Sequence, residues 1–411
     1  NNSGADVIIA DKSLENICND LSLNNEHEIF KLSFNGQIEG FNSYEEEISR
    51  FPTDPPIDNP KGTYMFYSSG TTGQPKGIKW PLLDEQIEAD HAHYLFHKEL
   101  WDYDENSISL VSSPLYHAAP AHMALTGHAF GGTVVMMPKF DAEDALRVIE
   151  KYKITHGQWV PTQFMRMYKL PEEVKSQYDV SSQKVITHAA APCPVELKHK
   201  MIDWWGNIFY EYYSGSEGIG MTHADPDQWL KFPGTVGKPL MGIIHICDDQ
   251  GQQVPPGEIG KIYFESDHEF NYHNDNKKRE KVKHSHHSSW SSFGDIGYVN
   301  EEGYLFLTDR ESFMIISGGV NIYPQEVENL LSMHEDVEDV AVIGIPDDDM
   351  GEQVKAFIKL SKSAEDRSNQ EQYFIEYTRS HLANYKCPKS ISFVDDLPRS
   401  DAGKLVKRYL K

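Results

Sequence analysis

Tyr67-Ser-Ser-Gly-Thr-Thr-Gly-Gln-Pro-Lys-Gly77 is the stretch of this sequence that decides the fold. It lies between two apolar segments and packs hydroxyls, glycines, one proline and one lysine into a short loop. The backbone N–H groups and hydroxyls of such a loop can surround a polyphosphate, with Lys76 as a point charge, and its glycines permit close approach of a ligand. It is not a Walker loop, because no Gly-Lys-Ser/Thr ends it. The alternative is a surface linker rich in serine, threonine and glycine.

Five further blocks follow this loop. They are Pro114-Leu-Tyr-His117, Tyr213-Ser-Gly-Ser-Glu217, Gly294-Asp295, Asp309-Arg310 through Gly318-Gly319, and Pro398-Arg-Ser-Asp-Ala-Gly-Lys404. With these blocks in this order, from near residue 60 to the C-terminus, the chain resembles the adenylate-forming superfamily. That superfamily contains acyl-CoA synthetases, nonribosomal-peptide adenylation domains and beetle luciferases, and the resemblance is greatest to CoA ligases for fatty or bulky acids.

The resemblance implies that the loop handles the β- and γ-phosphates of ATP. It assigns these residues to ATP binding: Ser68, Ser69, Gly70, Thr71, Thr72, Gly73 and Lys76. Thr72 is also expected to act in catalysis.

The bulk composition excludes several classes of partner. A formal net charge of −25 argues against nucleic acid, whose phosphates need a basic face. The four cysteines are far apart and form no CxxC pair, which argues against zinc and disulfides and favours the reducing cytoplasm. We expect no integral membrane segment, because no apolar run approaches the roughly 18 residues that a span requires. The oligomeric state stays open, with a homodimer as one option.

The first residues read as the middle of an α/β domain that enters a strand. Compared with an ordinary acyl-CoA synthetase, this sequence is expected to lack about the first quarter of the protein, because the chain is truncated or only partly ordered.

The hydrophobic pattern predicts two domains. Residues 1–311 are expected to form a large α/β domain of layered sheets with a small β-rich subdomain, and residues 312–411 a small α+β domain. The resemblance implies that the large domain binds AMP and that the small domain is mobile. The predicted strands are 132–137 (buried), 155–160, one that ends near Tyr213, 243–247, 261–264, 337–345, 354–360 and 391–394. Three helices are predicted: one capped by Asp141, one that runs from Pro194 to Trp205, and one around residues 371–383. Residues 267–292, rich in lysine and histidine, are read as a solvated surface loop rather than a metal or nucleic-acid site.

The chemistry implied by the resemblance is attack of a carboxylate on the α-phosphorus of ATP. Catalysis then needs a metal, a cation and preorganised donors, because negative charge gathers on the phosphate oxygens. Glu217 is a candidate ligand for Mg²⁺, which prefers oxygen donors, and it matches the glutamate that ends the family's Tyr-Gly-x-Thr-Glu motif. Tyr213 would flank the adenine, and Ser216 and Ala191 are placed among the nucleotide contacts. The alternative for Glu217 is an acidic residue in an exposed turn.

The same resemblance assigns the residues that contact the ribose of ATP and the carboxylate of the acid. Asp295 matches the family aspartate that accepts both ribose hydroxyls, and Arg310 matches the arginine that reaches the ribose or phosphate. Lys404 matches the lysine that bridges the carboxylate and the α-phosphate, which requires the small domain to close over the large one. His117 is either structural or a gate to the acyl pocket, and we favour a positioning role.

The second half-reaction needs coenzyme A. The resemblance implies that pantetheine passes the backbone at Gly318 and Gly319, and that Ser312 stands at the hinge between the domains. Cys193 and Cys387 are interpreted as structural rather than nucleophilic.

We therefore expect an AMP-forming acid–CoA ligase that uses ATP, Mg²⁺ and coenzyme A. Its substrate would be a fatty, steroid or other bulky carboxylic acid, and Trp159 either borders the acyl pocket or belongs to the core. The alternatives are an adenylation enzyme that loads the phosphopantetheine of a carrier protein, a non-catalytic nucleotide-binding protein and, remotely, a luciferase-like oxidation.

Overall fold

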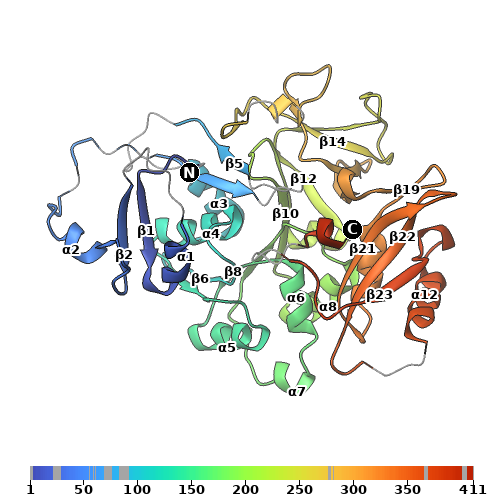
Figure 1. Cartoon of the computed structure of the whole chain (residues 1–411), viewed down its shortest axis with the longest axis horizontal. Helices are drawn as coiled ribbons and strands as arrows, with labels where there is room; N and C mark the ends of the chain where they lie inside the picture. Colours follow the sequence, from blue (N-terminus) through green and yellow to red (C-terminus); the bar gives the residue numbers. More distant parts are fainter. Residues whose placement is uncertain are drawn as a thin grey trace.

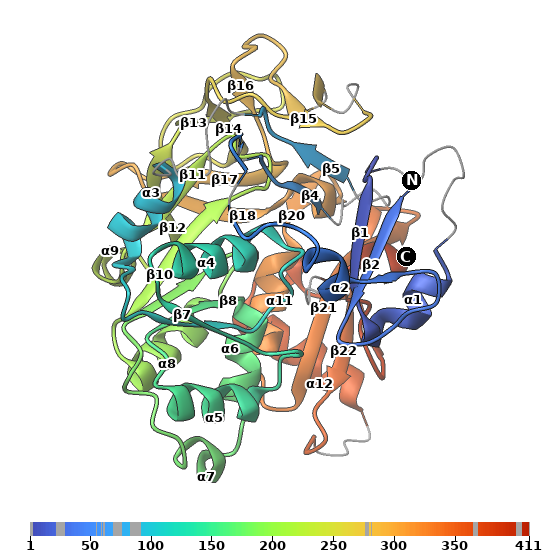
Figure 2. The same ribbon diagram turned by 90° about the vertical axis from the view of Figure 1, so that its left-hand side faces the viewer.

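The computed structural model of the chain describes residues 3–21, 29–54, 56–58, 60, 62–68, 76–82, 92–275, 279–280, 282–364, 369–399 and 405–410. Within these residues there is one twelve-stranded sheet, one five-stranded sheet and two three-stranded sheets. The large sheet occupies the middle of the molecule, with the N-terminal sheet on one side and the five-stranded C-terminal sheet on the other (Figure 1). Figure 2 shows the same elements from the side of the N-terminal sheet. None of the helices described is both long and apolar enough to cross a bilayer.

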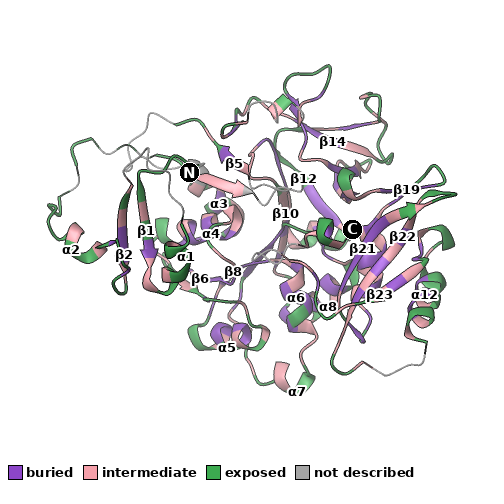
Figure 3. Cartoon of the chain, in the orientation of Figure 1, coloured by how far each residue is buried: buried purple, intermediate pink, exposed green. Residues whose placement is uncertain are grey.

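One half of the large sheet is parallel and is layered with helices. Its strands are β6 (Ile108–Val111), β7 (Thr133–Met136), β8 (His156–Trp159), β9 (Val185–His188) and β10 (Phe209–Ser214). Its helices are α3 (Ala92–Trp101), α4 (Ala118–Ala129), α5 (Ala142–Tyr152), α6 (Pro161–Tyr168), α7 (Glu172–Lys175) and α8 (Val195–Trp205). As the sequence predicted, the Asp141 side chain caps α5 by accepting a hydrogen bond from Asp144 N. One face of α5 is buried and the other is exposed (Figure 3).

The expectation of a buried strand at residues 132–137 was wrong in part. β7 forms there, but it is the last strand at this edge of the sheet, beside β6 alone. Met136 is 60% exposed, because only one side of an edge strand is covered by a neighbour. An apolar run predicts a strand but cannot place it in the sheet.

The other half of the large sheet is antiparallel and forms the β-rich part of the N-terminal domain. Its strands are β11 (Met221–Ala224), β12 (Thr235–Met241), β13 (Ile243–Cys247), β14 (Gly260–Glu265), β16 (Trp290–Ser291), β17 (Asp295–Val299) and β18 (Leu305–Arg310), with α9 (Pro226–Lys231) beside them. A separate hairpin of β4 (Met65–Ser68) and β5 (Lys76–Lys79) pairs with β15 (Asn271–Tyr272). The N-terminal sheet contains β1 (Val7–Asp11), β2 (Phe30–Phe34) and β3 (Asn42–Ser43), with the short helices α1 (Glu15–Asn19) and α2 (Tyr44–Ile48).

The interpretation of residues 267–292 as a solvated loop was wrong in part: residues 285–289 are exposed, but several aromatic residues of the segment are packed inside. Phe270 and Tyr272 lie in the core that joins β5 to the antiparallel half of the sheet. His284 and Trp290 are also buried, and the Trp290 ring stacks on His245 with centroids 3.6 Å apart. The segment therefore contributes to the core, although its charged residues made it look solvated. The described part of the chain holds no cluster of three metal-binding side chains.

The C-terminal sheet has its own hydrophobic core. Its strands are β19 (Ile315–Ser317), β20 (Val320–Ile322), β21 (Val337–Asp347), β22 (Gly351–Leu360) and β23 (Ser390–Phe393), with helices α11 (Pro324–Ser332) and α12 (Gln370–His381). This α+β unit and the larger α/β part confirm the predicted fold class. The predicted boundary at residues 311/312 lies in the turn Glu311–Phe313 between β18 and β19. The boundary and the mobility of the unit stay predictions.

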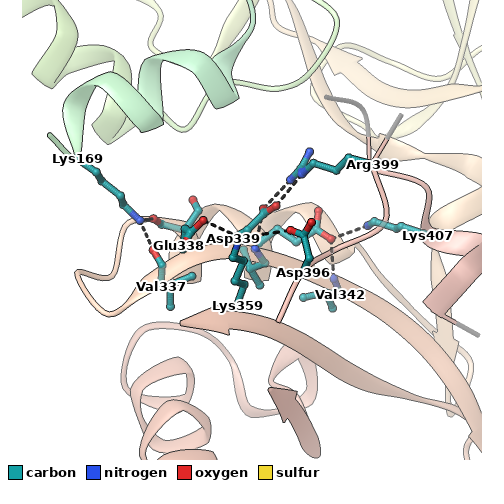
Figure 4. Close-up of polar contacts among 12 residues, drawn as sticks. Lys169, Val337, Glu338, Asp339, Val342, Lys359, Asp396, Arg399 and Lys407 are labelled. Atoms are coloured by element: carbon teal, nitrogen blue, oxygen red, sulfur yellow. Dashed lines mark hydrogen bonds and ion pairs between the residues drawn. The ribbon is translucent and has the colours of Figure 1, made fainter. Parts of the chain in front are cut away.

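Polar contacts hold the C-terminal unit against α6 in this structure (Figure 4). Lys169, which follows α6, donates through Nζ to the backbone oxygens of Ser332 (2.8 Å), the last residue of α11, and of Val337, the first residue of β21. Burial lowers the pKa of Lys169 to about 8. Met333 packs into the core of the parallel half beside this contact. Lys169 and Met333 therefore contribute to the orientation of the small unit in this structure, together with the hydrogen bond from Gln325 N on α11 to Asp309 Oδ2 on β18.

Candidate active site at the carboxyl ends of the parallel strands

Three segments with predicted functional residues meet at one edge of the large sheet. β6, β8, β9 and β10 are parallel neighbours, so their carboxyl ends lie along the same edge. His117 follows β6, Ala191 follows β9, and the turn Tyr213–Glu217 begins at the end of β10. The strand order reverses at β6, since β7 and β8 lie on its two sides. In open α/β sheets, ligands bind outside the carboxyl ends at such a reversal.

A buried carboxylate, Asp295, joins two other residues that the sequence predicted. Asp295 begins β17 and is paired across the sheet with Arg310 at the end of β18. The Tyr213 hydroxyl donates to Asp295 Oδ2 at 2.6 Å, and Arg310 Nε lies 3.2 Å from Asp295 Oδ1. Burial and the Asp295 carboxylate raise the pKa of Tyr213, which keeps this hydroxyl protonated as a donor. The arrangement gives one oriented carboxylate, with a cation on one side and an aromatic ring on the other.

A second group surrounds Glu217. The Tyr272 hydroxyl donates to Glu217 Oε1 at 2.8 Å, and Lys76 Nζ lies 5.3 Å from the centroid of the Tyr272 ring. Trp80 Nε1 donates to the backbone oxygen of Ser216 at 3.0 Å, which ties β5 to the turn after β10. The structure thus brings Lys76, at the start of β5, and Glu217, in the turn after β10, to the same side chain.

Glycine is required at position 215 by close packing. A Cβ at Gly215 would lie 2.4 Å from Phe293 and 2.9 Å from Glu217 Oε2. Such distances are shorter than real contacts, so any larger residue would move the carboxylate or the Phe293 ring. The same ring contacts Tyr213 edge-on with centroids 5.6 Å apart. Phe293 therefore connects the two groups of site residues.

A buried ion pair lies beneath this edge of the sheet. Lys198 Nζ, on α8, is 2.9 Å from Oε2 of Glu211, on β10, and Lys198 is fully buried. His188 Nε2 is 3.5 Å from the same oxygen, and burial lowers the pKa of His188 well below its usual range. Just beyond His188, Ala190 adopts φ of 73°, a left-handed conformation that costs a non-glycine residue energy. The pair anchors β9 and β10 just before the segments that carry Ala191 and Tyr213.

The remaining predicted residues are placed as follows. His117 is half-buried at the start of α4, with its ring centroid 4.4 Å from that of Tyr116. Ala191 is exposed. Gly318 and Gly319 form the two-residue turn between β19 and β20, with φ of 56° and 77°. Both values match a type I′ turn, so the hairpin alone accounts for these glycines.

Several predicted residues lie outside the part of the chain that the structure describes. They are Ser69, Gly70, Thr71, Thr72, Gly73 and Lys404. Ser68 ends β4, and the loop residues lie between β4 and β5, which pair antiparallel. On the N-terminal side of Lys404, Arg399 Nη2 lies 2.6 Å from Asp339 Oδ1 on β21. On its C-terminal side, Lys407 Nζ lies 2.7 Å from Glu328 Oε1 on α11 (Figure 4).

The site fits ATP with Mg²⁺ by its charge and its donor set. Mg²⁺ is commonly held by one or two carboxylates together with substrate phosphates, and Glu217 supplies one carboxylate. Lys76 and Arg310 could supply positive charge for phosphate oxygens. All four cysteines are free thiols, and Cys193 and Cys387 are buried, away from any role as nucleophile.

Sequence reasoning missed Tyr272, Trp80 and Phe293. Tyr272 shows a weak signal, because Phe270 and Tyr272 alternate with polar residues at the spacing of a strand. Conversely, Trp159 is fully buried and packs with Trp205, which places it in the core of the parallel half.

Comparison with known families agrees with this geometry. Residues 1–271 match the AMP-binding enzyme family, and residues 326–404 match the AMP-binding enzyme C-terminal domain. The first match covers more than half of the chain. The chain therefore belongs to the family of AMP-binding enzymes, as the order of its motifs predicted.

Individual relatives are named as CoA ligases. A long-chain-fatty-acid–CoA ligase of Bacillus subtilis (strain 168) is 32% identical over 89% of this chain and 64% of that ligase. A 2-succinylbenzoate–CoA ligase of Bacillus pumilus (strain SAFR-032) is 32% identical over 89% of this chain and 72% of that ligase. Among solved structures, the anthranilate CoA ligase AuaEII in complex with anthranoyl-AMP superposes with a TM-score of 0.82 at 26% identity, covering 99% of this chain and 77% of that one. The chain thus spans 64% to 77% of the length of these ligases.

Proposed function

We propose that this chain activates a carboxylic acid with ATP and transfers the acyl group to coenzyme A. In the first step a carboxylate oxygen attacks the α-phosphorus, the bond to the pyrophosphate oxygen breaks, and acyl-AMP and pyrophosphate form. In the second step the thiol of coenzyme A attacks the acyl carbon, the bond to AMP breaks, and the thiol proton is released. The carrying observation is the hydrogen-bonded set Tyr213, Asp295 and Arg310 beside Glu217 and Lys76 at one sheet edge.

Each residue has a role that follows from its chemistry. Asp295 is held by Tyr213 and Arg310 so that its carboxylate can accept the ribose hydroxyls, while the Tyr213 ring flanks the base. Lys76 contributes a cation for the phosphates from β5, next to the serine- and threonine-rich loop. Glu217 would hold Mg²⁺, which when bound neutralises charge on the phosphate oxygens. Lys404 would reach the carboxylate and α-phosphate from the C-terminal unit.

The second half-reaction is proposed to use a different orientation of the C-terminal unit. Ser312 is exposed and lies in the short turn between β18 and β19, where the chain passes from one sheet to the other. Rotation at this turn would carry the Gly318–Gly319 hairpin tip, which has open space around Gly319. A narrow hairpin turn without side chains suits the passage of pantetheine.

The proposed substrates are bulky or apolar acids such as fatty or steroid carboxylates. Support comes from the relatives, whose names give long-chain fatty acid, 2-succinylbenzoate and anthranilate as substrates. An aromatic group also lies beside α4, where His122 packs on Phe66 and Trp80 with ring centroids 5.4 and 6.3 Å away. A charged substrate amine would need a carboxylate partner, and the Tyr116–Pro120 segment supplies none.

The test is release of pyrophosphate across a panel of short, medium, long-chain, aromatic and sterol-type acids. Thioester is measured in parallel with coenzyme A or a phosphopantetheinylated carrier protein. We expect acid-dependent pyrophosphate and AMP, and thioester with free coenzyme A. Thioester only on the carrier protein would overturn the choice of acceptor.

Glu217→Gln should abolish most of the pyrophosphate release. The matched control is Glu265→Gln, which removes a carboxylate that accepts from His245 Nε2 at 2.8 Å on β14, away from the proposed nucleotide contacts. Formation of ADP and orthophosphate, or no acid dependence across the panel, would contradict the proposed reaction. Equal loss in both variants would show that Glu217 acts through the fold.

A further inference from the structure

Tyr272 is deeply buried, although the segment around it is mostly polar. It lies on the two-residue strand β15, in a stretch of mostly polar residues, yet it is only 3% exposed. Pairing with Ile78 of β5 places its ring on the inner face of the small sheet, the face on which Lys76 also lies. The neighbouring pair, Asn271 and Lys79, points to the opposite face. A short strand thus places the phenol ring of Tyr272 in the interior, beside Lys76.

Two contacts of this phenol involve residues of the proposed nucleotide site. Its hydroxyl donates to Glu217 Oε1 at 2.8 Å, which orients the carboxylate and leaves Oε2 over Gly215. Its ring lies under Lys76 Nζ at 5.3 Å, within the range of a cation–π interaction. Lys76 begins β5 and Glu217 lies in the turn after β10, and Tyr272 contacts both.

We propose that Tyr272 is a positioning residue that sets the carboxylate of Glu217 and the ammonium of Lys76 relative to each other. The inference rests on the proposed function, in which these two groups meet the metal and the phosphates of ATP. A carboxylate that holds Mg²⁺ needs one defined rotamer, and a hydrogen bond to its second oxygen supplies that definition. A lysine on a flexible stem is likewise confined when its ammonium lies over a ring.

Two variants separate the two contacts. Tyr272→Phe removes the hydroxyl but keeps the ring under Lys76, and Tyr272→Leu removes both. The control is Tyr103→Phe, because Tyr103 is also 3% exposed and its hydroxyl contacts Met123 Sδ at 3.8 Å in another core cluster. The melting temperature of each variant is also measured. A decrease of the same size in Tyr272→Phe and Tyr103→Phe is the general effect of removing a buried hydroxyl.

The measurement is calorimetric binding of α,β-methylene-ATP, which cannot release pyrophosphate, in Mg²⁺ and in EDTA. For Tyr272→Phe we expect affinity in EDTA to stay that of the wild type and the gain from Mg²⁺ to fall about 10-fold or more, as for other residues that orient a metal ligand. For Tyr272→Leu the affinity in EDTA should also fall, by about 2- to 5-fold, because the cation–π contact is lost. Tyr103→Phe should bind like the wild type in both conditions.

Other outcomes overturn the proposal. If Tyr272→Phe binds α,β-methylene-ATP in Mg²⁺ as tightly as the wild type does, the hydroxyl does not position the Glu217 carboxylate for the metal. If it loses affinity equally in Mg²⁺ and EDTA, its role is structural. Should Tyr272→Leu fail to fold, the phenylalanine variant still decides the matter. A wild-type chain that binds no nucleotide would refute both the proposed function and this inference, whereas nucleotide binding with acid-dependent pyrophosphate release and a neutral Tyr272→Phe refutes this inference alone.

Discussion

Replacing Lys198 by methionine tests how much the buried Lys198–Glu211 ion pair contributes to the stability of the fold beneath the candidate site. Lys198 Nζ on α8 lies 2.9 Å from Glu211 Oε2 on β10 and 4.3 Å from the centroid of the Trp229 ring. Lys198 is fully buried and Glu211 is 5% exposed. Methionine has a similar length, so Lys198→Met leaves the packing largely filled while it removes the positive charge that lies 2.9 Å from this carboxylate oxygen.

The expected loss of stability is large because Glu211 would remain charged and buried. Removing one partner of a buried pair costs about 3–5 kcal/mol. At about 2 °C per kcal/mol, the low end for large domains, this corresponds to a melting temperature lowered by about 6–10 °C. His188, 3.5 Å away, sets the low end of the range, because without Lys198 it can take up a proton and pair with Glu211.

Thermal unfolding of three proteins measures the effect: the wild type, Lys198→Met, and the double variant Lys198→Met/Glu211→Leu. The double variant should recover most of the loss, since an apolar pair of similar volume replaces the ions. Burial already raises the pKa of Glu211, and in Lys198→Met it should rise further. Stability tied to such a raised pKa is present at low pH and lost as pH rises, so the deficit of Lys198→Met should shrink below about pH 5. A deficit under about 2 °C, or a double variant no more stable than the single one, would refute this reasoning.

Three further outcomes are expected. Lys404→Ala should abolish pyrophosphate release but largely spare conversion of supplied acyl-adenylate to thioester, and equal loss of both would contradict its assignment to adenylation. Gly319→Trp should keep pyrophosphate release while acyl-CoA production collapses; Gly319→Asn, which tolerates the positive φ of 77° without the bulk, should keep both, and loss there would point to turn strain instead. Because burial lowers the pKa of Lys169 from its ordinary 10.5 to about 8, the folded wild type should gain stability relative to Lys169→Met as pH rises between these values. Melting temperatures at about pH 7 and pH 10 check this, and the opposite trend would show that the ammonium is favoured in the contact.

The sequence predicted those features of the fold that depend on local pattern. Asp141 was recognised as a helix cap because a short acidic side chain preceded apolar residues at helical spacing, and the structure confirms the cap. The strands 243–247 and 261–264 were predicted from short β-branched runs between turn residues, and β13 and β14 form there. The order of the motifs likewise predicted the family.

Features that depend on long-range pairing were not accessible in this way. Tyr272 reaches Glu217 only because β15 pairs with β5, far away in the sequence, and no local pattern encodes that partner. For the same reason β7 was expected to be buried, although its apolar run lies at the sheet edge. Trp159 shows the converse limit, because an aromatic residue after a strand can belong to a pocket or to the core, and here it lies in the core.

The origin of the oxygen in the AMP product tests the central claim most directly. The acid is supplied with oxygen-18 in both carboxylate positions, together with ATP, Mg²⁺ and coenzyme A, and AMP is analysed by mass spectrometry. If a carboxylate oxygen attacks the α-phosphorus and the thiol then attacks the acyl carbon, the oxygen that bridges the two groups leaves with AMP. We therefore predict one oxygen-18 atom in each AMP and one in the acyl-CoA. Unlabelled AMP, or label recovered in orthophosphate beside ADP, would contradict activation of the acid as an adenylate.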